Sequence, residues 1–66
     1  MRVAADVLKN PMPGDRTRIF EDHEFLITGR TADSVYYLYR GKPEECSLEN
    51  WIANAEDDEV LHVAQS

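Results

Sequence analysis

Three short segments rich in β-branched and aromatic residues follow one another between Asp15 and Gly41, and they constrain the fold more than any other feature of this chain. The segments are residues 16–20, 24–30 and 35–40, and their composition favours β-strands. The stretches between them, residues 21–23 and 31–34, have lengths typical of antiparallel hairpins. The sequence therefore predicts a three-stranded meander that a turn at residues 41–43 closes.

A helix and a last strand follow the predicted meander. A short extended piece near residues 44–46 leads to Ser47, whose hydroxyl is placed to cap a helix that carries Glu49 in its first turn. Cys46 is expected to pack on Trp51 as a hydrophobic staple. The apolar face of this helix is predicted to consist of Leu48, Trp51, Ile52 and Ala55. An acidic turn at residues 56–59 then precedes a strand at residues 60–63.

The first residues of the chain read as a separate short element. Val3, Ala4, Val7 and Leu8 form the apolar stripe of an amphipathic helix over residues 1–9, with a strand as the alternative. The prolines and glycine of residues 11–14 end either element. We therefore expect one domain over residues 1–66 that is mainly β with one short helix. For its N-terminal segment, residues 1–12, helix and strand both stay open as predictions. Residues 13–63 have the order of elements of a small, partly open SH3-like barrel.

A chain of 66 residues buries a small core. The single Cys46 forms no internal disulfide, and no CxxC or His/Cys cluster is present to hold a metal. A small core usually needs a further source of stability. The remaining source is docking on a protein partner, or a homodimer formed through Phe20, Leu26 and Leu38. One unpaired cysteine, no secretory signal and no membrane-spanning apolar run lead us to expect a cytoplasmic protein with no membrane partner.

Strand alternation assigns side chains to two faces of the meander. With Phe25 and Ile27 inward, the predicted core also holds Thr17, Ile19, Gly29, Val35, Tyr37 and Tyr39. The opposite face then mixes arginines with large apolar residues, and the candidate binding residues on it are Arg16, Arg18, Phe20, Arg30, Tyr36 and Arg40. Such a face could bind a carboxylate, a phosphate or a partner backbone. Alternatively, the N-terminal segment covers Phe20, Leu26 and Leu38.

Charge is divided unevenly along the chain. Residues 1–42 hold seven basic and six acidic side chains, whereas residues 43–66 hold seven acidic side chains and no basic one. The candidate acidic face consists of Glu44, Glu45, Glu56, Asp57, Asp58 and Glu59. It is a solvated surface, a docking face for a basic protein, or a mimic of nucleic-acid phosphates.

The side chains with reactive potential are not arranged for catalysis. His23 lies between Asp22 and Glu24 in a predicted loop, where neighbouring side chains diverge, and Cys46 follows two glutamates that raise a thiol pKa. We therefore expect no enzyme, no metal and no cofactor.

Three stretches carry a family resemblance: Pro13-Gly14-Asp15, Val35-Tyr36-Tyr37, and Glu45-Cys46-Ser47-Leu48 ahead of Trp51. In these the chain resembles small SH3-like barrel proteins encoded in phages and prophages, which implies binding rather than catalysis. The leading hypothesis is a non-enzymatic protein-interaction module, an accessory or host-modulating protein of phage or bacterial type. Nucleic-acid binding through the arginines and Tyr36 is the alternative, and a nucleic-acid mimic is the third hypothesis.

Overall fold

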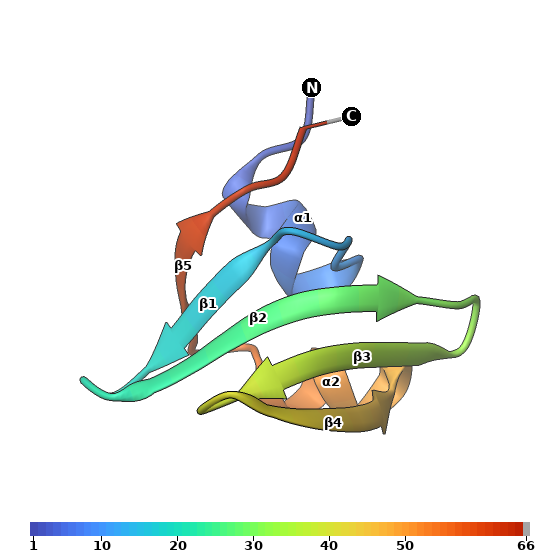
Figure 1. Ribbon diagram of the computed structural model, residues 1–66. Coiled ribbons are helices and arrows are strands. Elements are labelled where there is room, and N and C mark those ends of the chain that lie inside the picture. Colours follow the sequence, from blue (N-terminus) through green and yellow to red (C-terminus); the bar gives the residue numbers. More distant parts are fainter. Residues whose placement is uncertain (66) are drawn as a thin grey trace.

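The computed structural model describes residues 1–65, in which five antiparallel strands form one sheet and two short helices lie on one side of it (Figure 1). The strands are β1 (Arg16–Ile19), β2 (His23–Arg30), β3 (Ser34–Tyr39), β4 (Lys42–Ser47) and β5 (Glu59–His62), and the helices are α1 (Ala4–Lys9) and α2 (Leu48–Asn54). The strand order is β4-β3-β2-β1-β5, so the last strand returns to pair with the first. This confirms the predicted mainly β, partly open barrel built from a meander, a helical turn and a closing strand.

Two hairpin turns contain residues with positive φ. Tyr39 pairs with Lys42, which leaves Arg40 (φ 53°) and Gly41 (φ 80°) as a two-residue turn of type I′. Lys42 and Pro43 therefore belong to β4, which is longer than the extended piece predicted near residues 44–46. Phe20, with φ 58°, lies in the turn that joins β1 to β2 and not in the strand.

The core lies between α2 and the face of the sheet that we call the inner face, which carries Thr17, Ile27 and Val35. These three residues are buried, and Ile27 and Val35 form one cluster with Trp51 and Ala55 of α2. The side chains packed against this cluster are those of Leu8, Phe25, Tyr37, Cys46 and Leu48. Most of the predicted core is thereby confirmed, including the packing of Cys46 against the cluster that contains Trp51.

Ile52 was wrongly expected in this core, because its side chain is 41% exposed. Successive residues of a helix are turned by about 100°. Since Trp51 and Ala55 take the side of α2 that faces the sheet, Ile52 is turned toward α1, where it lines a shallow depression with Leu8 and Lys9.

The N-terminal segment is helical, as the apolar stripe indicated, and it packs on the same side of the sheet as α2. Val7 is fully buried, and its backbone carbonyl accepts a hydrogen bond of 3.1 Å from the Trp51 indole nitrogen. Leu8 contacts the inner cluster. The alternative in which this segment covers Phe20, Leu26 and Leu38 is therefore wrong.

A buried ion pair fixes the path of the chain ends. Both carboxylate oxygens of Asp15, which is fully buried, accept hydrogen bonds of 2.7 Å from the Arg2 guanidinium. The backbone N–H groups of Met12 and Ala64 donate to the same carboxylate. Burial by itself raises the pKa of Asp15, but these hydrogen bonds outweigh it and hold the pKa below its usual value. The two ends of the described chain consequently lie side by side (Figure 1).

Candidate functional site

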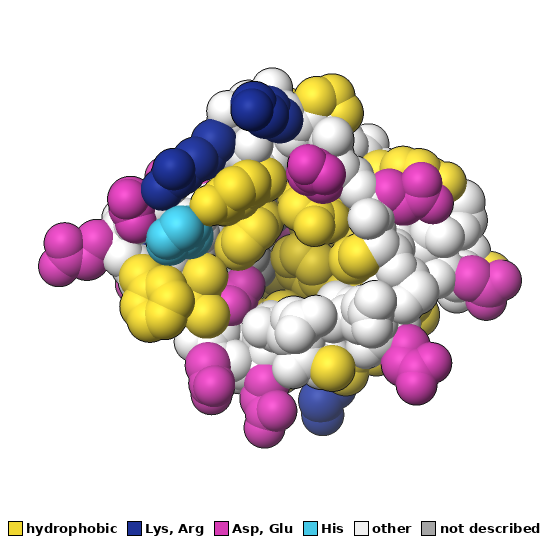
Figure 2. Space-filling model, turned by 90° about the horizontal axis from the view of Figure 1, so that it is seen from below, with side chains coloured by type: hydrophobic (Ala, Val, Ile, Leu, Met, Phe, Trp, Pro, Cys, Tyr) yellow, Lys and Arg dark blue, Asp and Glu magenta, His cyan; other side chains and the backbone are white. Residues whose placement is uncertain are grey.

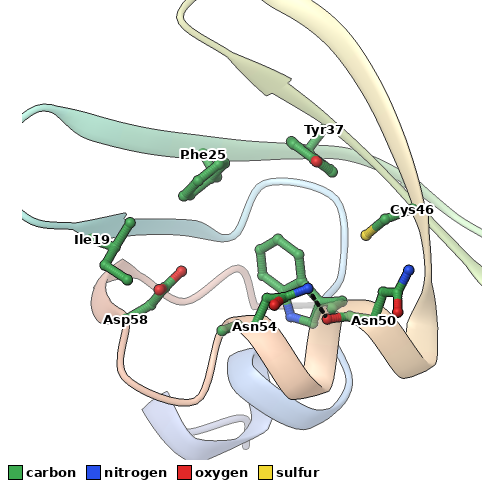
Figure 3. A pocket seen from close by; sticks show the side chains of 9 residues that line it. Ile19, Phe25, Tyr37, Cys46, Asn50, Asn54 and Asp58 are labelled. Atoms are coloured by element: carbon green, nitrogen blue, oxygen red, sulfur yellow. Dashed lines mark hydrogen bonds between the residues drawn. The ribbon is translucent and has the colours of Figure 1, made fainter.

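A pocket of about 280 Å³ lies between the inner face of the sheet and α2. We call it the mouth pocket. Its walls come from the sheet and from α2, and its lining residues are Ile19, Phe25, Tyr37, Cys46, Asn50, Trp51, Asn54, Ala55 and Asp58 (Figure 3). The space-filling view from below shows a hollowed face with hydrophobic side chains in and around the hollow and acidic side chains along its border (Figure 2).

Three aromatic rings line the mouth pocket, two of them placed by strand register and the third, Trp51, by α2. Phe25 pairs with Tyr39 and Ile27 pairs with Tyr37, so alternate residues of β2 and β3 project to the inner face. The ring centroids of Phe25 and Tyr37 are 5.6 Å apart, and those of Tyr37 and Trp51 are 5.9 Å apart. Interplanar angles of 77° and 53° at these distances show that the rings pack directly against one another, edge to face or tilted, and form one continuous aromatic wall.

The aromatic series continues from the pocket to the end of the β1–β2 hairpin. Tyr39 stacks on Phe25 at 5.3 Å and on His23 at 5.8 Å, and the Tyr39 hydroxyl lies 2.6 Å from Nδ1 of His23. Phe20 meets the edge of His23 at 5.9 Å. His23 is thus part of an aromatic row, and its Nε2 lies 3.5 Å from Asp22 Oδ1, where the sequence predicted a loop with diverging side chains.

Polar groups occupy the wall of the pocket that α2 and the following loop provide. Asn50 and Asn54 are one helical turn apart, and the Asn54 side-chain amide donates to the backbone carbonyl of Asn50 (2.9 Å, Figure 3). Asp58 accepts a hydrogen bond of 3.2 Å from the hydroxyl of Thr17, which is fully buried. Burial raises the pKa of Asp58, the Thr17 hydrogen bond opposes this, and Asp57 adds to it, so that the net shift is upward.

Cys46 and Tyr37 keep their protons on the opposite wall of the pocket, which the sheet provides. Burial, followed by the charge of Glu45, raises the pKa of the Cys46 thiol. Burial also raises the pKa of Tyr37, with smaller contributions from Cys46 and Glu44. Neither group is activated as a nucleophile or base at neutral pH.

The outer face of the sheet carries arginines that are paired with carboxylates. Arg16 contacts Glu24 at 2.6 Å and Arg18 contacts Glu59 at 2.6 Å. Beside these pairs, Leu26, Leu38 and Pro43 occupy opposite positions on neighbouring strands and form an apolar row, which Tyr36 extends. Leu26 and Tyr36 are each 37% exposed.

Three predicted members of the outer face lie elsewhere. A bulge between Ile27 and Gly29 shifts the register, so Gly29 pairs with Tyr36 and Arg30 pairs with the buried Val35. Arg30 consequently faces the inner side and donates to Asn10 Oδ1 and to the Pro11 carbonyl. The expectation that Arg30 shares a face with Arg16 was wrong for this reason, as was the inward assignment of Gly29.

Phe20 and Arg40 are the other two, and both lie in hairpin turns. Phe20 is 79% exposed beside His23. Arg40 pairs with Asp22 at 3.1 Å and lies 5.5 Å from the Tyr39 ring. The positive φ of each residue turns its side chain away from the strand alternation that predicted its place.

The six acidic residues predicted as one face are divided among several surroundings. Glu44 stands opposite Tyr37 and Glu45 opposite Tyr36, so neighbouring residues of β4 point to different faces. Asp58 lines the mouth pocket and Glu59 pairs with Arg18 on the outer face. Glu56 and Asp57 are exposed between α2 and β5.

Sequence reasoning missed the contributions of Asn50, Asn54 and Asp58 to a pocket. The available signal was the spacing of Asn50 and Asn54, which are one helical turn apart on either side of Trp51 in the sequence. Within residues 1–65, no group of three or more His, Cys, Asp or Glu side chains is placed to hold a metal ion. In the same residues no helix has the length and apolarity needed to cross a bilayer.

Comparisons with protein-family models, with curated proteins and with solved structures found no match.

Proposed function

We propose that this protein is a non-enzymatic protein-interaction module that binds a partner protein through the outer face of its sheet. The observation that carries the proposal is the apolar row of Leu26, Leu38 and Pro43, which neither helix covers. Exposed contiguous apolar side chains rimmed by charged ones are typical of protein interfaces.

The small core supports the same proposal. The buried hydrophobic residues are Val7, Ile27, Val35, Trp51 and Ala55. A domain with so few buried side chains has a narrow stability margin, and a partner that binds the folded state alone stabilises it by mass action.

The arginine pairs favour a protein partner over nucleic acid. Arg16 and Arg18 each hold a carboxylate at 2.6 Å on the outer face, so much of their charge is neutralised before any ligand arrives. Phosphate binding relies on unneutralised basic side chains, and the chain carries a formal charge of −6. The division of the acidic side chains between both faces of β4 also weighs against a mimic of a phosphate row.

The resemblance to small phage and prophage barrels supports a role as an accessory or host-modulating protein. Binding with no reaction is the property that this resemblance implies. The raised pKa values of Cys46 and Tyr37 agree with it, since neither group is poised for proton transfer or nucleophilic attack.

Affinity capture from a bacterial lysate with a matched pair of variants tests the proposal. Leu26→Ser combined with Tyr36→Ser removes apolar surface from the outer face. Val3→Ser combined with Met12→Ser removes exposed apolar surface (56% and 39% exposed) from the N-terminal segment. Proteins bound by the wild type and the control, and lost with the outer-face variant, would support the proposal; equal capture by all three would refute it.

Two further measurements separate the alternatives. A titration with single-stranded oligonucleotides, followed by NMR at low and high salt, should leave the amides of Arg16, Arg18 and Tyr36 unshifted. Light scattering over a dilution series should show whether the apolar row instead pairs two copies of the chain. Salt-dependent shifts on β1 and β3 would favour a nucleic-acid ligand over a protein partner.

A further inference from the structure

The mouth pocket combines features that the outer-face proposal does not use. Its volume of about 280 Å³ lies just below the range of about 300–1,000 Å³ for small-molecule sites. A space of this size accommodates a side chain better than a cofactor. It is also distinct from the outer face, because its walls are the inner face of the sheet and α2.

The aromatic walls are suited to a cation that carries an apolar stem. Phe25, Tyr37 and Trp51 line the pocket together, with the Phe25 and Trp51 rings in edge-to-face contact at 86° and with their centroids 6.3 Å apart. Aromatic faces attract a lysine or arginine head group electrostatically. Their apolar surface packs the methylene stem of the same side chain.

The polar wall supplies acceptors for that head group. Among the hydrogen bonds of residues 1–65, the Asp58 side chain accepts one, from Thr17, although an ionised carboxylate offers about four acceptor positions. Asn54 uses its amide N–H toward Asn50 and keeps its side-chain oxygen as an acceptor beside the pocket. A carboxylate held in apolar surroundings with few partners gains from a cationic ligand.

The charges around the pocket favour the same sign of ligand. Glu44 lies opposite Tyr37 on β4, and the exposed Glu56 and Asp57 precede Asp58. Lys42 stands opposite Tyr39 at the end of β4, and Arg40 in the β3–β4 turn pairs with Asp22. The lining itself contains one carboxylate and no basic residue.

From these observations we infer that the mouth pocket binds a lysine or arginine side chain of a partner protein, with its stem packed against the aromatic wall and its charge beside Asp58 and Asn54. The inference rests on the proposed function, because it takes the ligand to be a protein segment. The acidic border would steer a basic segment toward the pocket.

NMR titration with short peptides tests this inference without knowledge of the partner. The probes are acetylated, amidated pentapeptides Ala-Ala-X-Ala-Ala, in which X is arginine, lysine, norleucine or glutamate. The arginine and lysine peptides should shift resonances of Phe25, Trp51 and Asn54, and bind about fivefold or more tightly than the norleucine peptide. Equal binding of the norleucine peptide would overturn it. So would the absence of any shift at the pocket with peptide at up to about 10 mM, which is about ten times the Kd of a millimolar complex.

Matched variants locate the effect. Asp58→Asn should weaken the arginine peptide about fivefold and leave the norleucine peptide unchanged, whereas Glu56→Gln makes the same change of charge two residues away and should have a small effect. Asn54→Asp adds a carboxylate to the pocket and should strengthen binding of the arginine peptide, a gain that misfolding cannot imitate. Identical affinities for the wild type, Asp58→Asn and Asn54→Asp would contradict the assignment.

The two proposals fail in different ways. Loss of captured proteins with the outer-face variant, together with no binding of the cationic peptides, would sustain the interaction module and overturn the pocket. Binding of the cationic peptides, together with equal capture of proteins by the wild type and the outer-face variant, would support the pocket assignment and refute the proposal for the outer face.

Discussion

The indole Nε1 of Trp51 donates a hydrogen bond of 3.1 Å to the backbone carbonyl of Val7, and this bond joins the two helices on the inner side of the barrel. Trp51 is 5% exposed, Val7 is fully buried, and the ring also forms a wall of the mouth pocket. One side chain therefore couples the N-terminal segment, the core and the candidate binding site.

Replacement of Trp51 should be the most damaging single change. Trp51→Ala is expected to lower the free energy of unfolding by about 3–5 kcal/mol, a large part of the stability of a domain this small. Trp51→Phe keeps much of the packing but leaves the Val7 carbonyl without its donor, which should lower it by about 1–3 kcal/mol. Urea unfolding followed by circular dichroism measures both, and an unchanged midpoint for Trp51→Ala would contradict the core described above.

Acid should destabilise the protein through Asp15. The pKa of Asp15 is lower in the folded state than its usual value, so its stabilising contribution is complete above about pH 4 and is lost as pH falls through the folded-state pKa. Thermal unfolding between pH 2 and 7 measures this loss. Asp15→Asn should be less stable at neutral pH and should lose less stability in acid. If Asp15→Asn shows the same dependence of stability on pH as the wild type, the acid sensitivity does not come from Asp15.

Asp58 should change the stability of the protein with pH in the opposite direction to Asp15. The pKa of Asp58 is raised, so the native state holds this proton more tightly than the unfolded state does. The stabilising contribution is therefore complete below about pH 4 and is lost as pH rises through the folded-state pKa. Asp58→Asn, which keeps an acceptor for Thr17, should therefore be at least as stable as the wild type at pH 7, and the difference should vanish in acid. A variant that is less stable at pH 7 would show that the carboxylate is needed for folding.

Two glycines should respond in opposite directions to the same substitution. Gly41 has φ 80° and open space around it, so Gly41→Ala should lower the free energy of unfolding by about 1–2 kcal/mol through backbone strain alone. At Gly29 a new Cβ would meet the Tyr36 ring at an ordinary 3.5 Å, so Gly29→Ala should be neutral or stabilising by up to about 1 kcal/mol. A loss at Gly29 as large as that at Gly41 would contradict the ordinary contact described at Gly29, and unchanged stability of Gly41→Ala would argue against the type I′ turn.

The sequence predicted those parts of the fold that local pattern controls. The meander, the helix capped by Ser47, which accepts a hydrogen bond from Asn50, and the closing strand all follow from composition and spacing. β4 escaped prediction in part because Pro43, Glu44 and Glu45 have little strand preference. Its conformation comes from the two-residue turn that places it beside β3.

The errors in the candidate site have a geometric cause. One bulge at residues 28–29 exchanges the faces of Gly29 and Arg30, and simple alternation does not anticipate a bulge. The position of α1 depends on Arg2 reaching Asp15, a contact between residues 13 positions apart that no local pattern indicates. The mouth pocket likewise requires the distance between α2 and the sheet, which only the three-dimensional structure provides.

The pairing order of the sheet has a consequence for solubility. Because the barrel is not closed and β4 and β5 are the end strands of the sheet, β4 presents a free strand edge. Pro43 lacks a backbone N–H, and exposed Glu44 and Glu45 follow it, so a second chain that tried to extend the sheet would meet a missing donor and two like charges. Glu44 and Glu45, which contribute to the uneven charge of the chain, thus oppose the extension of the sheet by a second chain.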